Sequence, residues 1–380
     1  MRKDISIWQD ALQWQKCDLA IIGAGIVGLS AAIYARILRP DWQVVVFEKA
    51  LYPDGATVRN AGFACFGSPS EIIGDLKMME EEAVISIIRK RYLGLQALFS
   101  LVPRQAMDFE NTGSFDVFFR EDRAQFEQVQ EQLAFLNQLV EAATGLQEVF
   151  TIADDRRPHF GFDNIDHLVQ NRWEGTLHSG KMMAALLRKA YDLGVRVYWG
   201  YEMVEYKAQK TGKVVLQFSN NVPFHTKKLL IANNGFANQL FPELDVYPVR
   251  NQVMVTSPIQ GLNWKGAFHK EAGYVYFRNV GNRVLIGGAR HLDFEGSVTG
   301  EPGEIREITS YLNSLLSKHI LPEASYAIEY SWNGFLGLGA TKEPIVQLIE
   351  DQIGVAVRLG GMGVAIGTLV GKEAAEMLYK

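Results

Sequence analysis

The chain has 380 residues and a hydrophobic content of 48%, enough to fill the cores of two domains. Its net charge of −5 argues against a general nucleic-acid-binding protein, because such proteins neutralise phosphates with clustered Lys and Arg side chains. Only two cysteines are present, Cys17 and Cys65, so we expect no disulfide framework and a reducing, cytoplasmic location.

The first 15 residues carry charges and lack the apolar core of a signal peptide, so we expect them to remain in the mature chain. Ile5, Trp8, Leu12 and Trp14 are spaced so that they could share one face of a short helix. We expect this face to pack on the protein's own domain, and peripheral contact with a membrane is the alternative. No apolar run reaches the roughly 18 residues of a membrane span.

Residues 17–48 predict a β-strand, a glycine turn, a helix and a second β-strand. Apolar runs at 17–22 and 43–48 have the length of buried strands. A helical pattern covers 29–38, directly after the glycines. The segment therefore predicts a βαβ unit.

The glycine turn carries Gly23, Gly25 and Gly28 in the spacing G-x-G-x-x-G. This spacing allows a tight turn, approach of the backbone to a pyrophosphate, and close packing of the helix. Glu48 stands 20 residues past Gly28 at the end of the second strand, where an acid accepts hydrogen bonds from adenosine ribose hydroxyls. We expect a dinucleotide there; the alternative is that the glycines serve only the turn and Glu48 faces solvent.

The stretch 55–68 is rich in small residues and has neither helical nor strand periodicity. A flavin is a broad ring system that backbone can approach closely, so Ala61 and Gly62 favour FAD over NAD as the dinucleotide. Arg59 and Asn60 would face the pyrophosphate or the ribityl chain. For Arg59, a surface ion pair is the alternative.

The rest of the chain alternates between α/β and antiparallel patterns. Helices are expected near 70–100, 126–140 and 180–193, strands at 114–119 and 195–200, and antiparallel sheet over 246–334. The C-terminus returns to a strand, a glycine turn and a helix.

These patterns predict an α/β fold class: a Rossmann-type FAD-binding domain interrupted by an α+β substrate domain with an antiparallel sheet. The expected FAD-binding segments are 1–85, 150–245 and 335–380. The expected substrate-binding segments are 86–149 and 246–334.

The segments "IIGAGIVGLSAA", "VVVFEK" and "GATVRNAGFA" resemble the D-amino acid oxidase and sarcosine oxidase superfamily of FAD-dependent oxidoreductases. The branch that resembles gamma-glutamylputrescine oxidoreductase is the most similar. The resemblance continues in "GTLHSGKMMAALL", "LLIANNGFA", "NRVLIGGAR" and "GGMGVAIGT", and so covers nearly the whole chain, from about residue 17 to 375.

The resemblance and the motifs together imply one set of cofactor-binding residues. The expected contacts are Gly23, Gly25, Ile26, Val27, Gly28, Glu48, Lys49, Arg59, Asn60, Ala61, Gly62, Val204, Asn234, Gly235, Gly360, Gly361, Met362, Gly363 and Val364. Some sarcosine oxidases tether the flavin through a cysteine just ahead of the C-terminal block, and this chain has none there. We therefore expect noncovalent FAD and read Cys65 as a small buried thiol.

The substrate site departs from relatives that oxidise glycine or D-amino acids. Where the resemblance places a carboxylate-binding Arg, this chain reads Gly334 to Gly337, and apolar Val364 and Leu285 stand where sarcosine-type members have Lys. This favours an amine, or an amino acid with a longer substituent, over glycine or sarcosine.

The remaining candidates for substrate contact or catalysis are Tyr276, Arg290, Arg278 and His178. For the first three, a structural role is the alternative, and His178, which precedes a helix, suits capping. His269 and His291 are weaker candidates. No metal site or Ser or Cys nucleophile motif is predicted.

The predicted function is FAD-dependent oxidation of a C–N bond in an amine or amino acid. Hydride would pass to flavin N5, and the resulting imine would hydrolyse. Oxygen or a quinone would reoxidise the flavin. The alternatives are a non-catalytic flavin-binding subunit and a flavoprotein that modifies tRNA wobble uridine. The exact substrate, the choice between oxidase and dehydrogenase, and the oligomeric state stay open.

Overall fold

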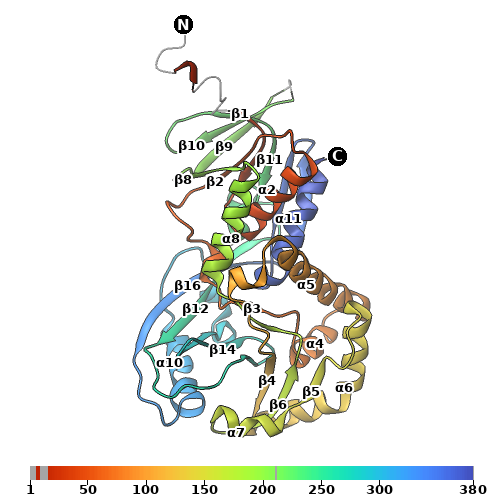
Figure 1. The fold of residues 1–380 in the computed structure, drawn as a ribbon, viewed down its shortest axis with the longest axis vertical. Helices are drawn as coiled ribbons and strands as arrows, with labels where there is room; N and C mark the ends of the chain where they lie inside the picture. Colours follow the sequence, from red (N-terminus) through yellow and green to blue (C-terminus); the bar gives the residue numbers. More distant parts are fainter. Residues whose placement is uncertain (1–5, 9–15, 210–211, 380) are drawn as a thin grey trace.

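The protein, in a computed structural model that describes residues 6–8, 16–209 and 212–379, contains two eight-stranded sheets and one two-stranded sheet. In Figure 1 the first sheet lies at the top, and the second lies in the lower half. Between and around them pack helices from distant parts of the sequence.

The first sheet is the predicted Rossmann-type sheet. Its order is β17 (Ile345–Glu350), β18 (Ile353–Val357), β11 (Phe224–Ile231), β1 (Lys16–Ile22), β2 (Val44–Glu48) and β8 (Arg196–Trp199). The β10 strand (Val214–Phe218) pairs with β11, and β9 (Met203–Ala208) pairs with β10. The neighbours from β18 to β8 are parallel, which explains why β1 and β2 are apolar on both faces.

The second sheet is mostly antiparallel. Its order is β16 (Ile328–Leu338), β12 (Tyr247–Thr256), β15 (Arg283–Gly288), β14 (Val275–Val280), β13 (Ala267–Lys270), β4 (Ser114–Phe119), β6 (Ile165–Asn171) and β5 (Phe150–Ile152). The pair of β13 and β4 is parallel. A small third sheet joins β3 (Phe63–Ala64) to β7 (Gly175–Thr176).

The α-helices flank both sheets. They are α2 (Ile26–Leu38), α3 (Ala56–Arg59), α4 (Pro69–Leu76), α5 (Glu81–Leu101), α6 (Arg123–Thr144), α7 (Arg157–Phe160), α8 (Ser179–Asp192), α9 (Phe294–Ser297), α10 (Arg306–Leu315) and α11 (Gly363–Tyr379). Short 3₁₀ turns cover Arg104–Met107, Arg120–Asp122, Asp154–Arg156, Asn234–Gln239 and Arg290–Leu292, and a π-helical turn covers Leu316–Ile320.

Close packing of α2 and α11 explains the glycines of the last helix. A Cβ at Gly367 would lie 2.6 Å from Ile26 Cγ2, and one at Gly371 would lie 2.6 Å from Val27 O. The two helices stand beside the first sheet in Figure 1. The G-x-x-x-G series of α11 therefore serves helix packing.

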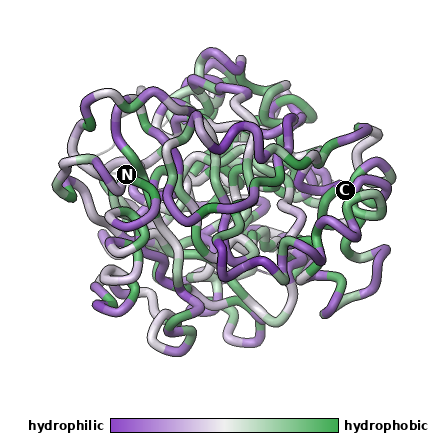
Figure 2. Tube along the Cα trace, turned by 90° about the horizontal axis from the view of Figure 1, so that it is seen from below, coloured by the Kyte–Doolittle hydropathy of each residue, from purple (hydrophilic) through white to green (hydrophobic). Residues whose placement is uncertain are grey.

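Aromatic side chains fill the core of the second sheet. The Phe268 ring stacks on Phe115 and on Phe277, at centroid distances of 5.2 and 4.8 Å. On the first sheet, Phe47 packs against Phe218 at 4.5 Å. Figure 2 shows apolar segments running through the centre of the molecule, while polar segments form many of the outer loops.

Two strands lie in a different unit from the one that the sequence predicted. Residues 150–171 were expected in the FAD-binding domain, but β5 and β6 pair within the second sheet, next to β4. The predicted boundary near 335 also falls inside β16, whose ladder with β12 runs from Ile328 to Leu338.

The predicted N-terminal helix face lies mostly outside the described residues, because Ile5, Leu12 and Trp14 are among those left out. Trp8 is described, and its side chain is 76% exposed. Among the described residues, none of the helices combines the length and the apolar character that crossing a membrane requires.

Candidate active site

A single cavity of 1510 Å³ is lined by the loops of the first sheet and by side chains of the second. It is larger than the roughly 300–1,000 Å³ of ordinary small-molecule pockets, and so has room for a dinucleotide together with a substrate. Its lining includes Gly23 and Glu48, beside the first sheet, and Tyr276 and Arg290, on the side of the second sheet.

The predicted glycine turn forms one end of the cavity. Gly23 has a φ of +107°, and a Cβ there would lie 2.6 Å from Ala232 O. A Cβ at Gly28 would lie only 1.9 Å from Gly23 O, so Gly28 serves helix packing and does not line the cavity. Gly25, Ile26 and Val27 line the cavity at the start of α2, where the first N–H groups and the helix dipole favour a pyrophosphate.

Glu48 and its neighbours form the expected ribose site. The Glu48 carboxylate accepts backbone N–H groups from Ala24 at 3.0 Å and from Ala50 at 3.1 Å, which fixes it at the end of β2. Lys49 also lines the cavity, with its amine 5.0 Å from the centre of the Phe236 ring.

Val204, one of the expected cofactor contacts, does not belong to the cavity lining. Met203 lines the cavity, whereas Val204 does not, and the Val204 side chain is 56% exposed. Side chains alternate along β9, so the Met203 side chain lies on the cavity side of the strand, and a contact through the Val204 backbone stays a prediction.

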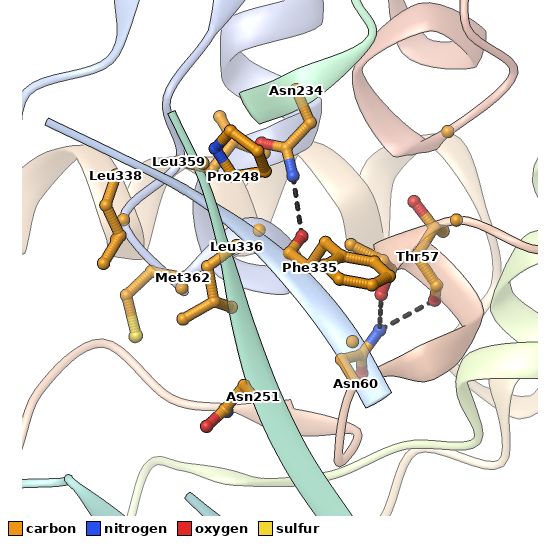
Figure 3. A pocket seen from close by; sticks show the side chains of 18 of the residues that line it. Thr57, Asn60, Asn234, Pro248, Asn251, Phe335, Leu336, Leu338, Leu359 and Met362 are labelled. Carbon is orange, nitrogen blue, oxygen red and sulfur yellow. Dashed lines mark hydrogen bonds between the residues drawn. The ribbon is translucent and has the colours of Figure 1, made fainter. Parts of the chain in front are cut away.

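The stretch 55–62 forms the short helix α3 and a turn at the cavity wall. Arg59 pairs with Asp54 and also donates to Asn333 O at 3.2 Å, so its guanidinium ties α3 to β16. Asn60 donates to the carbonyls of α3, as Figure 3 shows, and accepts the Gly62 N–H at 2.8 Å.

Ala61 lines the cavity, as the sequence predicted, but Gly62 does not. Gly62 has a φ of +73°, and a Cβ there would lie 2.3 Å from Leu177 O. The glycine is therefore required by the neighbouring chain segment, and not by the ligand.

Three buried amide oxygens along the cavity wall have no hydrogen-bond partner among the described residues: those of Asn233, Asn234 and Asn251. Buried polar atoms are normally satisfied, so these acceptors indicate a ligand with O–H or N–H donors, as the ribityl chain and ring of a flavin provide. The amide nitrogen of the Asn234 side chain donates to Phe335 O at 2.9 Å (Figure 3). Gly235 packs against Pro248 and lies outside the lining.

The C-terminal glycine turn faces the same cavity. Gly360 and Gly361 have φ values of +58° and +83°, conformations that suit glycine. Both line the cavity with Met362, Gly363 and Val364, and α11 begins at Gly363. The N-terminus of this long helix supplies positive potential at the cavity wall.

Tyr276 and Arg290, two of the predicted substrate residues, line the cavity on the side of the second sheet. The Tyr276 hydroxyl accepts a hydrogen bond from Asn251 at 2.9 Å, and burial raises the pKa of Tyr276, which keeps it protonated. The Arg290 guanidinium lies 5.1 Å from the ring centres of Tyr274 and Phe294. Within the described ranges, no acid forms an ion pair with Arg290.

Two other predicted candidates have structural roles. Arg278 donates to Gly62 O and Leu177 O, both at 2.9 Å, and burial lowers its pKa to about 10. His178 is exposed and caps α8, where its Nδ1 accepts the Lys181 N–H at 3.3 Å. Neither residue lines the cavity, so His178 and Arg278 are not substrate contacts in this structure.

Two of the three apolar departures from the resembling enzymes, residues 334–337 and Val364, line the cavity, whereas Leu285 does not. Gly334 to Gly337 line the cavity, and a Cβ at Gly337 would lie 2.4 Å from Asn234 Oδ1. Leu285 is 5% exposed and packs with Val253 and Val255.

A charged cluster at the cavity wall was missed by sequence reasoning. Glu71 accepts from Arg91 at 2.9 Å and from Lys342 at 2.9 Å, and Lys342 also pairs with Asp75 at 2.6 Å. Burial acts to raise the pKa of Glu71, but the two cations outweigh it and lower the pKa. Arg91 and Lys342 are 251 residues apart in sequence, a separation that no local pattern could have revealed.

Over residues 18–377, the sequence matches the DAO family model, described as FAD dependent oxidoreductase. The chain belongs to this family. It is 24% identical over 374 residues to the probable oxidoreductase OrdL of Rhizobium meliloti, covering 96% of this chain and 83% of that protein.

Solved structures of the same fold agree with the DAO family assignment. L-proline dehydrogenase from P. horikoshii superposes with a TM-score of 0.75 at 17% identity, covering 96% of this chain and 93% of that one. Glycine oxidase from Geobacillus kaustophilus gives 0.75 at 18% identity, covering 96% and 95%. The predicted family and the two-domain FAD-binding architecture are confirmed, and the chain is an FAD-dependent oxidoreductase.

Proposed function

We propose that this DAO-family enzyme oxidises a C–N bond of an amine or amino acid, with FAD bound noncovalently. The observation that carries the proposal is the continuous cavity, in which the dinucleotide cradle and the Tyr276 and Arg290 side chains line one space. Similar proteins named L-proline dehydrogenase, glycine oxidase and iminodiacetate oxidase support this substrate class.

Arg290 is the group that would bind a substrate carboxylate. Its guanidinium lies against two aromatic rings, 5.1 Å from each ring centre, and among the described residues it has no acidic partner to displace. A planar guanidinium forms a bidentate pair of hydrogen bonds with a carboxylate. Arg290 lies over Tyr274, which directly precedes β14, and both Arg290 and Tyr276 line the cavity.

Tyr276 would orient the substrate at the centre of the cavity. Because its hydroxyl already accepts from Asn251, its own O–H is free to donate to the substrate. Leu336, Leu359 and Met362 line the cavity and exclude water from the reacting atoms (Figure 3).

Bound FAD would supply the hydride acceptor for the carbon next to nitrogen. This chain's residues hold it: the N-termini of α2 and α11 and the Glu48 carboxylate. Cys65 lines the cavity but is 2% exposed, and burial raises its pKa well above the ordinary value. A neutral thiol is a poor nucleophile, which supports noncovalent binding.

Anaerobic mixing of the yellow protein with a panel of amines and amino acids tests the proposal. We expect the flavin to bleach with at least one amino acid that carries a bulky or N-linked substituent. A panel in which every compound leaves the bound flavin oxidised would contradict the proposal and favour a role as a flavin-binding subunit.

A further inference from the structure

A buried cluster of Cys65, Glu174 and His269 closes the cavity beside Phe63. The three residues come from the chain after β3, the residue before β7, and β13. One nitrogen of His269, the Cys65 sulfur and a Glu174 carboxylate oxygen all lie within 4.8 Å of one another. Cys65 and His269 line the cavity, and Glu174 lies behind them with 1% of its surface exposed.

Glu174 is a buried carboxyl that is poised to exchange a proton. Burial raises its pKa to about 7, although hydrogen bonds from Ser114 and from the Phe66 and Gly67 N–H groups act to lower it. The Cys65 thiol donates to Gly175 O at 3.9 Å, and its sulfur lies within 4.8 Å of a Glu174 carboxylate oxygen. A carboxyl with a pKa near 7 both accepts and releases a proton near neutral pH.

His269 connects the carboxyl to the cavity. Burial lowers its pKa to about 4, so the imidazole is neutral and presents one acceptor and one donor nitrogen. Its Nε2 is buried and has no hydrogen-bond partner among the described residues. The ring is held edge-on to Phe63 at 5.1 Å.

Charged groups from other elements surround the cluster. Glu71 from α4 and Arg91 from α5 both interact electrostatically with His269, and Arg91 also interacts electrostatically with Glu174. Arg278 from β14 acts on Cys65. Glu71 and Arg91 are paired with each other, so their opposing effects on His269 largely cancel.

We propose that this cluster takes up the proton that a substrate ammonium must lose before its C–N bond can be oxidised. His269 would accept the proton, Cys65 would pass it on, and Glu174 would hold it. The proposal rests on the proposed function, since it requires an amine or amino acid as substrate.

The proton balance is complete without any further reactant. The ammonium nitrogen gives a proton to the cavity side of the His269 ring. In the same concerted step, the other ring nitrogen gives its proton to the Cys65 sulfur while the thiol gives its own proton to the Glu174 carboxylate. The products are a neutral amine, a carboxylic acid at Glu174, an unchanged thiol and the other imidazole tautomer. Separations of up to 4.8 Å leave room for one bridging water.

The pH dependence of flavin reduction tests this path, using the amino acid that bleaches the flavin best in the panel. In the wild type, we expect the second-order rate constant to rise about tenfold per pH unit below a pH of about 7, as Glu174 loses its proton. In Glu174→Gln only free amine can react, so this limb should no longer end near pH 7 but should continue up to the pKa of the substrate ammonium, and the rate constant at neutral pH should fall by about 10²- to 10⁴-fold.

Two further variants separate a proton path from a structural role. Asp116→Asn alters another buried carboxyl, whose pKa burial raises to about 6, and should keep the limb. Cys65→Ser keeps an O–H for transfer and should react faster than Cys65→Ala. A limb that still ends near pH 7 in Glu174→Gln would overturn the proposal.

An infrared measurement on the resting FAD enzyme needs no substrate. On raising the pH through about 7, a carboxylic acid band should disappear, and the S–H band of Cys65 should shift as its partner ionises. Both changes should be absent in Glu174→Gln. If the S–H band of the wild type does not respond to pH, the proton path is refuted but the proposed function is not. If no compound in the panel reduces the flavin, both the proposed function and the proton path are refuted.

Discussion

Single side chains decide which ligand groups the cavity can bind. Both oxygens of Glu48 are oriented by backbone N–H groups, and each retains a lone pair for a ribose hydroxyl. This arrangement is rigid before the ligand binds. In the proposed complex, recognition of the adenosine half of FAD would depend on one negative charge in a fixed position.

Glu48→Lys should weaken FAD binding at least ten- to a hundredfold, because hydrogen bonds to a charged group contribute about 1.5–3 kcal/mol. Titration of the apoprotein with FAD, followed by quenching of flavin fluorescence, measures the dissociation constant. Glu82→Lys, at an exposed position on α5, makes the same charge change and should bind FAD normally. Equal affinities in the two variants would refute the assignment of Glu48.

Arg290→Gln should raise KM for amino acid substrates by about ten- to a hundredfold, because a charged hydrogen-bonding pair is lost. The same variant should leave KM unchanged for amines that have no carboxylate. Steady-state kinetics with both substrate types measures the difference, and Arg188→Gln on the exposed face of α8 is the matched control. A parallel change for both types would show that Arg290 does not bind the carboxylate.

The sequence predicted the cofactor side of the site better than the substrate side. Gly25, Glu48 and Gly361 belong to local patterns whose geometry is set by neighbouring residues. The role of Arg278 depends on partners far away in the chain, the carbonyls of residues 62 and 177, whereas Arg290 lies over Tyr274 and Phe294, which are near it in sequence. No spacing rule distinguishes these two arginines.

At the level of elements, the α2 helix is tied to β1 through one glycine contact. The Gly28 Cα approaches the glycine turn so closely that a Cβ would lie 1.9 Å from Gly23 O. The N-terminus of α2, which faces the cavity, is therefore positioned by this contact.

Gly28→Ala should destabilise the protein by about 1–3 kcal/mol through overpacking and should weaken FAD retention with it. Gly55→Ala is the matched control for stability alone, because a Cβ there meets no atom within 4 Å, although Gly55 lines the cavity. Urea denaturation measures the stability of both variants, and absorption of the purified protein measures flavin occupancy. If Gly28→Ala unfolds at the same urea concentration as Gly55→Ala, the close contact is not needed.

Element types followed from periodicity, but sheet membership did not. The predicted strand at 114–119 and the predicted helix at 180–193 correspond to β4 and α8. Residues 150–171 were placed in the wrong unit because apolar alternation shows that a strand exists but does not show which strand it pairs with. The parallel pairing of β13 with β4 joins segments about 150 residues apart, which local patterns cannot reveal.

Across the whole molecule, the buried carboxyl of Glu174 links stability to pH. Its pKa is raised from 4.5 to about 7 on folding, so the folded protein binds this proton more tightly than the unfolded chain. The stabilisation is fully present below a pH of about 4.5 and is lost as the pH rises through about 7.

The unfolding free energy of the wild type should therefore fall by up to about 3 kcal/mol from this group between mildly acidic and mildly alkaline pH. Glu174→Gln cannot ionise, so its stability should fall less over the same interval. Urea denaturation of both proteins at several pH values gives the comparison. Parallel pH profiles for the two proteins would show that Glu174 does not titrate in the folded state.

The central claim is that one cavity, built from both ends of the chain and from two sheets, holds FAD without a covalent bond. The most direct measurement is the absorption spectrum of the purified protein, followed by denaturation and analysis of the supernatant. The account predicts a yellow protein that releases free FAD. A colourless protein that takes up no added FAD, or one that releases NAD, would contradict it.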